Sequence, residues 1–500
     1  MGEEKPTFAH VASLGIGKEA SLSDKASLDA DVDPTVNAEE TKRLIRKIDW
    51  RILPLLNVVY LFCYLDRSNI GNAKLLSLEE DLGIDQVGYS WGLSIFFIGY
   101  VLFEVPSNMM LKRSLPSRWL ALIIVIWGSL CACMAANTGT TSLLIIRFLL
   151  GAAEAGFFPG VVYYLTLWYN RSEMCTRLAS FYFASSLAGV TGGLLAYAMH
   201  GLNGLGGLTA WRWLFLLEGI PTVLLGGVVY YCLADSPQVV KWLSSKEKNQ
   251  IAWRLMATKT LEPESHGVDW QQVREAYLDF KTYLYALIQI GMVIPTYSIA
   301  FLLPSVINSL GFDLVTSQLL TAPLYFCSAI FCIILALHSD RRRERGLHVA
   351  FSALLGIIGF LLITFIRNQL AQYLVLLLVL AGVNGCHAVN VSWATNNAIG
   401  KTKAAVVSAT TIALGNIGGI IAGQMYRNVE KPHFVPSHMG NFTCLLVCAG
   451  AAITLKFILR RENRRIESFI KEAELDPALW NDPRRMPPTL RVNRDFRFMD

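Results

Sequence analysis

Two pairs of charged residues interrupt stretches of sequence that are otherwise apolar enough to cross a membrane. Arg147 and Glu154 lie seven residues apart in the apolar segment 143–168. Two helical turns, about 10 Å, separate them, so both side chains project from one face of a single helix. Asp66 and Arg67 interrupt a second apolar segment. Because charges in hydrocarbon cost several kcal/mol each unless they are paired or hydrated, these four residues indicate a pathway for a charged solute.

The two residue types can do different chemistry in such a pathway. Arg67 and Arg147 stay charged and can bind a carboxylate through two parallel hydrogen bonds. Asp66 and Glu154 can take up or release a proton when a neighbouring charge changes. If the two helices face each other, an entering anion competes with the carboxylates for the guanidinium groups and favours their protonation. The pattern therefore predicts coupled anion and proton binding, and a fixed structural ion-pair network is the alternative.

A polar stretch in the second half of the chain is a further candidate. Asn390 and Trp393 lie three residues apart and so share one helix face. An amide and an indole there can bind the polar body and the ring of a solute. Hydrogen bonding between helices explains the same residues equally well.

Long apolar segments must position these side chains. The chain of 500 residues is 53% hydrophobic and only 16% charged, whereas about 25% of the residues of a soluble protein are charged. Each apolar run holds about 20 residues, the length that a helix needs to cross a membrane. We expect twelve such spans, at about 52–72, 88–110, 117–136, 143–168, 176–199, 211–233, 283–304, 316–337, 347–366, 370–393, 404–425 and 440–459.

The spans divide into six plus six around a long polar segment, which predicts an all-α membrane protein of two pseudo-symmetric six-helix bundles. The expected organisation is a disordered, acidic and Ser-rich N-terminal tail (1–49), a first bundle (50–233), a central loop (234–282), a second bundle (283–460) and a C-terminal tail (461–500).

The distribution of Lys and Arg between short loops predicts the orientation. The proposed inner loops hold eleven, Lys112, Arg113, Arg118, Arg171, Arg177, Arg341, Arg342, Arg343, Arg345, Lys401 and Lys403, and the outer loops hold five, Lys74, Arg212, Arg367, Arg427 and Lys431. Basic residues concentrate on the cytoplasmic side of membrane proteins, so both termini are expected in the cytoplasm.

Several other functions find little support. The ten cysteines fall in or beside apolar runs without C-x-x-C spacing, which indicates buried thiols rather than a metal site. Gly400-Lys401-Thr402 resembles the end of a phosphate-binding loop, but Thr395 occupies the position of the required first glycine. The net charge of +6 reflects cytoplasmic loops. We therefore expect no enzyme activity, no metal or cofactor and no nucleic-acid partner.

The loop between spans eight and nine carries an acid at a helix end beside a run of basic residues. Asp340 precedes Arg341, and Arg345 closes the run. This pattern is typical of a cytoplasmic gate or of a topology signal, and we expect no substrate there.

Several motifs together resemble those of the major facilitator superfamily. They are LDRSNIGNA at 65–73, the helix that carries Arg147 and Glu154, WRWLF at 211–215 and DSP at 235–237. The resemblance covers roughly residues 42–470 and is closest to the anion:cation symporter family, in its fungal allantoate-permease branch.

The resemblance implies roles for individual residues. Asp66 and Glu154 match the proton-titrating acids of the family, and Arg67 and Arg147 match its anion-recognising positions. Further matches are the cavity-lining positions Tyr64, Asn390, Ser392 and Trp393, and the gating motif of Asp340, Arg341 and Arg345.

The resulting prediction is a monomeric plasma-membrane symporter with both termini in the cytoplasm. It takes up a small organic anion, such as nicotinate, allantoate or pantothenate, with H⁺ as coupling ion, by alternating access between the bundles. Lipid and the anion are the only partners expected. Export of an anionic metabolite by the same fold and a non-transporting nutrient sensor are the alternatives.

Overall fold

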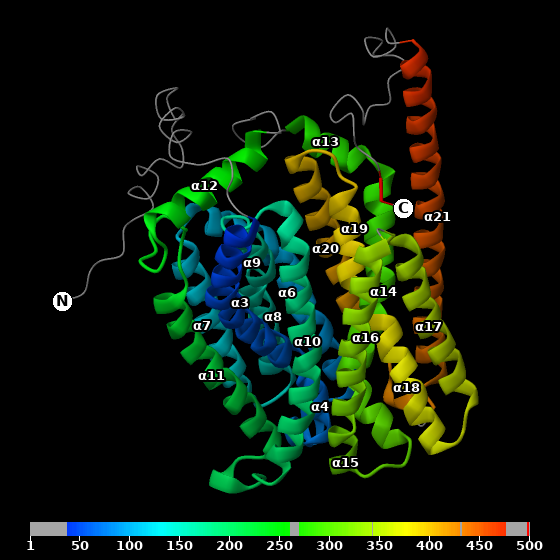
Figure 1. Ribbon diagram of the computed structural model, residues 1–500. Helices are drawn as coiled ribbons and strands as arrows, with labels where there is room; N and C mark the ends of the chain where they lie inside the picture. Colours follow the sequence, from blue (N-terminus) through cyan, green and yellow to red (C-terminus); the bar gives the residue numbers. More distant parts are fainter. Residues whose placement is uncertain (1–37, 261–269, 343, 431–432, 477–497, 500) are drawn as a thin grey trace, which may run out of the picture.

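The chain folds into two helical bundles that lie side by side (Figure 1). The computed structural model describes residues 38–260, 270–342, 344–430, 433–476 and 498–499, and within these ranges all regular structure is helical. An apolar chain in lipid has to satisfy its backbone hydrogen bonds internally, and helices do so within each segment.

The first half forms one bundle and the helices that follow it. Its elements are α3 (Ala38–Ser68), α4 (Ile70–Leu75), α5 (Leu78–Leu82), α6 (Gln86–Arg113), α7 (Pro116–Met134), α8 (Thr140–Glu154), α9 (Phe157–Leu165), α10 (Arg171–His200), the 3-10 helix η1 (Leu205–Gly207), α11 (Ala210–Cys232), α12 (Ser245–Thr260) and α13 (Trp270–Leu278).

The second half forms the other bundle. Its elements are α14 (Phe280–Ser309), α15 (Leu314–Leu319), α16 (Thr321–Arg342), α17 (Gly346–Phe365), α18 (Gln369–Asn384), α19 (His387–Asn396), α20 (Lys401–Ala422), the 3-10 helix η2 (Asn428–Glu430) and α21 (Val435–Leu475).

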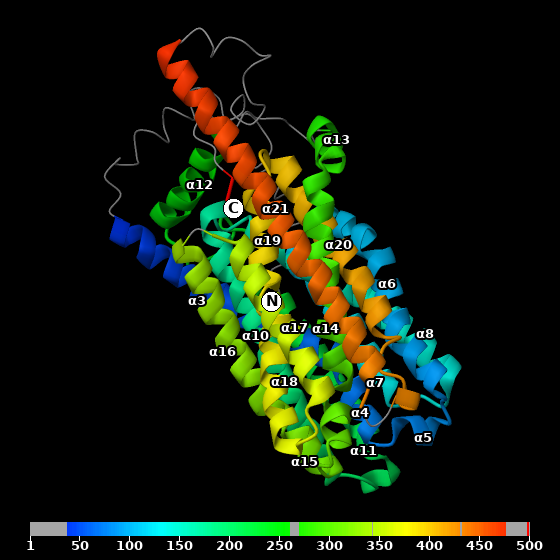
Figure 2. The same cartoon turned by 90° about the vertical axis from the view of Figure 1, so that its right-hand side faces the viewer.

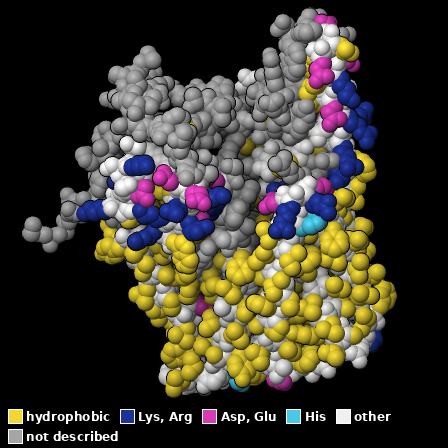
Figure 3. All heavy atoms as spheres, viewed as in Figure 1, with side chains coloured by type: hydrophobic (Ala, Val, Ile, Leu, Met, Phe, Trp, Pro, Cys, Tyr) yellow, Lys and Arg dark blue, Asp and Glu magenta, His cyan; other side chains and the backbone are white. Residues whose placement is uncertain are grey.

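The predicted fold class is confirmed. Eleven helical segments in the described part of the chain are long and apolar enough to cross a membrane, and the 30-residue helix α10 occupies the place of the remaining predicted span. On the face shown in Figure 3, hydrophobic side chains form a broad band, and Lys, Arg, Asp and Glu gather at the end that carries α12 and α13. A protein with this surface is embedded in a membrane.

Contacts within each half are extensive, and the halves meet along fewer helices. In the first bundle α7 packs on α11 and α6 on α8; in the second α14 packs on α20 and α17 on α21. Between the bundles α10 packs on α16 and α6 on α20. The Ser94 hydroxyl of α6 donates to the Ile420 carbonyl of α20 at 2.8 Å and accepts from the Gln424 amide at 2.8 Å.

Helical structure begins earlier and ends later than the predicted bundles. Helix α3 starts at Ala38, inside the segment expected to be a disordered tail, because Leu44 and Ile48 are buried against the bundle. Helix α21 continues to Leu475, past the predicted boundary, and extends beyond the bundle in Figure 2. Residues 1–37 and 477–497 of the two predicted tails lie outside the described residues.

Ion pairs join the first half of α3 to the polar segment between the bundles and to α10 of the first bundle. Lys47 pairs with Glu247 of α12 at 2.9 Å, and Asp49 pairs with Arg177 of α10 at 2.7 Å. Partial burial disfavours the ionised form of Glu247, but hydrogen bonds from Lys47 and the Ser244 backbone outweigh this effect and lower the pKa of Glu247. The segment that sequence analysis treated as a loop therefore contains a helix bonded to the first bundle.

Two glycines allow α6 and α8 to approach closely, and this approach positions the charged residues of α8. A Cβ atom at Gly151 would overlap the Phe96 carbonyl, and one at Gly99 would overlap the Phe148 carbonyl. Backbones can come this close only where a side chain is missing.

Gly151→Ala should therefore push α8 away from α6 and lower the free energy of unfolding by about 1–3 kcal/mol, the usual penalty for overpacking. Thermal unfolding of the purified protein in detergent would measure this loss. Gly227→Ala is the matched control, because a Cβ at Gly227 of α11 meets no atom within 4 Å. Equal stability of the two variants would contradict the assigned contact.

Candidate functional site

A buried ion pair joins the first and fourth spans. Arg67, in the last turn of α3, donates through Nε (3.0 Å) and Nη2 to Oε1 of Glu154, the last residue of α8. The Cys63 thiol donates to the same oxygen at 2.9 Å. Arg67 is 7% exposed and Glu154 1%. The two spans thus face each other at these residues, and one acid and one guanidinium of the four predicted residues form a direct pair.

Aromatic rings surround the Arg67 guanidinium. Its carbon lies 5.1–6.0 Å from the ring centroids of five residues, Tyr64, Phe96, Phe97, Tyr100 and Tyr297. The faces of aromatic rings attract cations, and the attraction is strongest where water is excluded. Tyr64, a predicted cavity-lining residue, therefore lies beside the predicted anion-binding arginine.

One of these rings belongs to the other bundle. Arg67 Nη1 donates to the Tyr297 hydroxyl of α14 at 2.6 Å, and the Tyr297 ring stacks on Tyr64 with centroids 6.3 Å apart. The guanidinium thus contacts a carboxylate of one bundle and a hydroxyl of the other. Sequence analysis did not identify Tyr297, because a tyrosine in an apolar span carries no signal of its partner.

Arg147 is fully buried next to this cluster. Its Nε donates to the Gly92 carbonyl at 3.2 Å, and its guanidinium carbon lies 5.0 Å from the Phe96 ring that also borders Arg67. Nη1 and Nη2 have no hydrogen-bond partner among the described residues. Arg147 and Glu154 share a helix face, but the acid pairs with Arg67 instead. The cluster thus holds one paired guanidinium, that of Arg67, and a second, that of Arg147, whose Nη1 and Nη2 can donate hydrogen bonds to an anionic ligand.

Asp66 points to a different set of neighbours from Arg67. Adjacent residues on a helix project about 100° apart. The Asp66 carboxylate accepts hydrogen bonds from Trp127 (3.2 Å), Cys131 (3.2 Å) and Thr222 (3.4 Å), which lie on α7 and α11. The structure therefore places the two predicted acids on separate sides of α3.

A third buried acid accompanies Asp66. Oxygen atoms of Asp66 and Glu218 and the sulfur of Cys131 lie within 4.8 Å of one another. Glu218 of α11 accepts a hydrogen bond from Asn69, and its second oxygen has no partner among the described residues. Two neighbouring buried carboxyls can share a proton. Glu218 was not among the predicted site residues, although an acid in the apolar sixth span was a visible signal.

A cavity lies between the bundles beside these clusters. It is small, with a volume of about 10 Å³, and its walls include Ser68, Asn69 and Asn72 of the first bundle and Thr321 and Tyr325 of the second. Polar residues from the LDRSNIGNA motif therefore border the space that separates the two bundles.

The predicted residues of span ten lie elsewhere, in the second bundle. Asn390 donates to the Tyr285 carbonyl (3.2 Å) and to Gln289 Oε1 (2.8 Å). Trp393 is fully buried, and its indole nitrogen donates to the Met499 carbonyl at 2.7 Å. Ser392 accepts a hydrogen bond from Asn396 at 3.3 Å. In this conformation these hydrogen bonds join the residues to their own half of the chain and not to Arg67.

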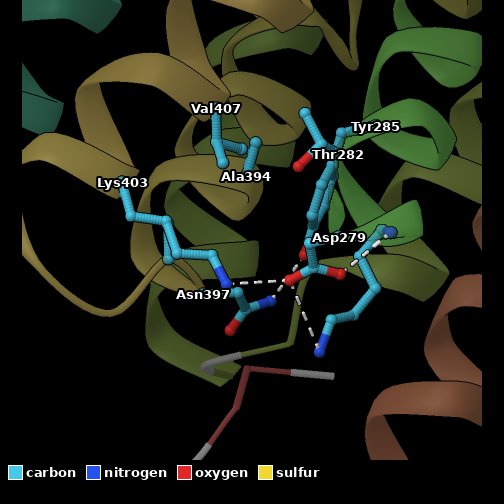
Figure 4. Close-up of a pocket in the computed structure, with 9 residues that line it drawn as sticks. Asp279, Thr282, Tyr285, Ala394, Asn397, Lys403 and Val407 are labelled. Atoms are coloured by element: carbon cyan, nitrogen blue, oxygen red, sulfur yellow. Dashed lines mark hydrogen bonds and ion pairs between the residues drawn. The ribbon is translucent and has the colours of Figure 1, made fainter. Parts of the chain in front are cut away.

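Charged residues and amides surround a small pocket next to Trp393 (Figure 4). Lys403 donates to the Asp279 carboxylate at 3.0 Å, and Asn397 donates to the Tyr285 hydroxyl at 2.9 Å. These contacts tie α19 and α20 to the start of α14.

The loop predicted as a gate forms contacts within the second bundle. Asp340 pairs with the buried Arg345 at 2.6 Å, whereas Arg341 is exposed. Glu344 of the same loop pairs with Lys456 of α21 at 2.6 Å. The loop thus fastens α16 and α17 to α21.

Comparison with known proteins places this geometry in a wider group. The sequence model of the Major Facilitator Superfamily matches residues 56–423. The MFS transporter prlL of a fungal species is 36% identical over 440 residues, which cover 86% of this chain and 89% of that protein. A putative tartrate transporter of Agrobacterium vitis is 34% identical over 427 residues, which cover 85% and 92%. Both relatives are named as transporters and not as enzymes.

A solved structure shows the same fold. The crystal structure of a D-xylose–proton symporter superposes with a TM-score of 0.61 over 81% of this chain and 97% of that one, at 14% sequence identity. At this identity the similarity concerns the fold alone.

Removing one partner of the Arg67–Glu154 pair should destabilise the protein more than removing both. Arg67→Met leaves a buried carboxylate unpaired, which typically costs about 3–5 kcal/mol, and the double variant Arg67→Met/Glu154→Gln should recover most of this loss. Thermal unfolding of the unmodified protein, Arg67→Met, Glu154→Gln and the double variant measures the coupling. Additive losses in the two single variants would contradict a direct pair.

Proposed function

The chain belongs to the Major Facilitator Superfamily, and on this premise we propose that it is a symporter that couples proton entry to the uptake of a small organic anion. Membership makes it a multi-pass membrane transporter of a small molecule. The Arg67–Glu154 pair, buried between the bundles and bonded to Tyr297, is the observation that carries the proposal.

An anionic solute can replace Glu154 as the partner of Arg67. A guanidinium in a dry interior needs a negative partner, and Glu154 fills that role in this structure. Glu154 accepts both Arg67 N–H groups with the single oxygen Oε1, whereas a carboxylate that reaches Arg67 can accept them with two oxygens. Such a carboxylate therefore competes with Glu154 for the same N–H groups.

Glu154 depends on Arg67 for most of its hydrogen bonds. Its Oε1 accepts three hydrogen bonds, and two of them come from Arg67. When an anion takes Arg67, Glu154 loses its cationic partner in a buried site. Taking up a proton removes the charge that has become unpaired. Anion binding and proton binding thus favour each other, which is the requirement for symport.

Two buried positive charges near one another favour an anion as the solute. Arg147 adds a second buried positive charge whose Nη1 and Nη2 lack hydrogen-bond partners in the described part of the chain. Arg67 and Arg147 flank the same Phe96 ring, so both charges act on one region. The relative from Agrobacterium vitis is named for tartrate, a dicarboxylate. We therefore propose a carboxylate as the substrate class.

Access of the solute to Arg67 depends on the hydrogen bond between Arg67 and Tyr297. Tyr297 belongs to the second bundle, so its bond to Arg67 breaks when the bundles separate around the site. Movement of one bundle against the other around a central site is the general mechanism of such transporters. Release of Tyr297 would free an N–H group of Arg67 for the anion at the moment when the pathway opens. The bias of basic loops supports an orientation with both termini in the cytoplasm, and the proposed location is the plasma membrane.

Accumulation of a carboxylate in proteoliposomes should depend on an imposed pH gradient, and Glu154→Gln should abolish that dependence. The glutamine cannot exchange a proton, but the variant should still exchange internal for external substrate. Uptake of radiolabelled carboxylates, tartrate first, with and without the gradient measures both properties, and Glu80→Gln at an exposed position is the control. Gradient-independent accumulation by the unmodified protein would refute proton coupling.

Arg147→Ala should reduce transport by at least about 100-fold, because removal of a buried charge-assisted contact to a bound anion costs about 3 kcal/mol or more. Because the buried side chain also donates from Nε to the Gly92 carbonyl, the variant loses some stability as well, and uptake is compared per folded protein in the membrane. Uptake, membrane delivery and thermal unfolding are measured together, with exposed Arg367→Ala as the control. Normal uptake by Arg147→Ala would exclude its role in anion recognition.

A further inference from the structure

The end of the chain returns to the second bundle. The described residues Phe498 and Met499 lie against α14, α19 and α21, where the C-terminus is marked in Figure 1. Phe498 is only 6% exposed and belongs to the hydrophobic core cluster. Phe498 stays buried only where specific contacts offset the loss of conformational entropy of its segment.

Two asparagine side chains bind the backbone of this segment. Asn463 of α21 accepts from the Phe498 N–H at 3.0 Å and donates to the Phe498 carbonyl at 2.9 Å. Asn397, which follows α19, accepts from the Met499 N–H at 2.7 Å and donates to the Met499 carbonyl at 2.9 Å. An asparagine amide offers one acceptor and two donors, so it can pair with a peptide unit as a neighbouring strand does.

The indole of Trp393 completes the set. It donates to the same Met499 carbonyl at 2.7 Å. All four backbone polar groups of residues 498–499 thus have side-chain partners. Because these hydrogen bonds are made to backbone N–H and C=O groups, they can bind an extended peptide but do not by themselves select side chains.

Selectivity comes from the Phe498 ring. The ammonium of Lys281 lies 4.7 Å from the ring centroid, and the same ammonium pairs with Glu462 at 2.8 Å. A buried aromatic ring beside an oriented cation favours an aromatic residue at this position. The site therefore fits an extended peptide segment with an aromatic residue.

Helix α19 is the element that this segment restrains. It is only 10 residues long and is separated from α18 by Gly385 and Cys386. It packs on α14 and α20 of its own bundle and also touches α10 of the other bundle. A short helix that follows an interruption can pivot more readily than a continuous span. Trp393 and Asn397 lie near the C-terminal end of α19, before α20 begins.

We propose that Trp393, Asn397 and Asn463 form a binding site for an extended peptide, that residues 498–499 of the same chain are its resident ligand, and that their docking restrains α19. Released, the segment leaves α19 tied to α21 by fewer contacts and free to move against the other bundle. The site is then open to a peptide of the same chemistry. The inference does not depend on which solute the protein carries.

Hydrogen exchange of the full-length protein in lipid nanodiscs tests the proposal by mass spectrometry. The amides of residues 498–499 should be protected in the unmodified protein. Phe498→Ala should raise their exchange rate, and that of α19, by about tenfold or more, because several hydrogen bonds and an aromatic contact are lost together. Asn463→Ala should act in the same way, and exposed Arg464→Ala should change neither rate.

A peptide with the sequence of residues 491–500, added to the Phe498→Ala protein, should restore protection of α19, and the same peptide with Phe498 replaced by alanine should not. Unprotected amides at 498–499 in the unmodified protein would overturn docking. Faster exchange of the segment without any change in α19 would overturn the restraint. Failure of the peptide to bind would limit the site to the covalently attached segment and overturn the proposed peptide specificity.

Discussion

The buried ion pair between Arg67 and Glu154 joins the first and fourth spans, and the other contacts of the site are arranged around it. Five aromatic rings surround the Arg67 guanidinium, which also donates a hydrogen bond to Tyr297 of the other bundle. The partner carboxylate is held by α8, and α8 is held against α6 by the close contact of Gly151 with the Phe96 backbone. The close approach of the α6 and α8 backbones therefore helps to place the Glu154 carboxylate beside the Arg67 guanidinium.

The rotation between adjacent helix positions separates two chemical environments. Asp66 lies among Trp127, Cys131, Thr222 and Glu218, where its partners are neutral donors and a second acid. Glu154 lies beside a guanidinium that a solute can claim. One acid can thus respond directly to an anion, whereas the other can exchange a proton with its acidic neighbour. Both environments border α3, the helix that carries Asp66 and Arg67.

Each bundle uses its ends differently. The first bundle buries its charges near the interface with the second. The second bundle places its ion pairs and amides at the end that carries α13, where Asp279, Lys281 and Lys403 meet and where Trp393 contacts the end of the chain (Figure 4). Trp393 and Asn390 are thereby engaged within their own bundle in this conformation. A role for them at the solute site requires α19 to move.

The apolar runs in the sequence determined the fold class and the number of spans, because a helix of about 20 apolar residues is the stable solution for a chain in hydrocarbon. The isolated charges within those runs indicated which residues matter, since their burial is costly. Pairing was decided only by the tertiary structure: Glu154 shares a helix face with Arg147 but bonds to Arg67. Glu218, Tyr297 and Met499 became visible as partners only when distant segments met. Spacing along one helix fixes the face on which a residue lies, whereas its partner depends on how helices pack, and that is a property of the whole chain.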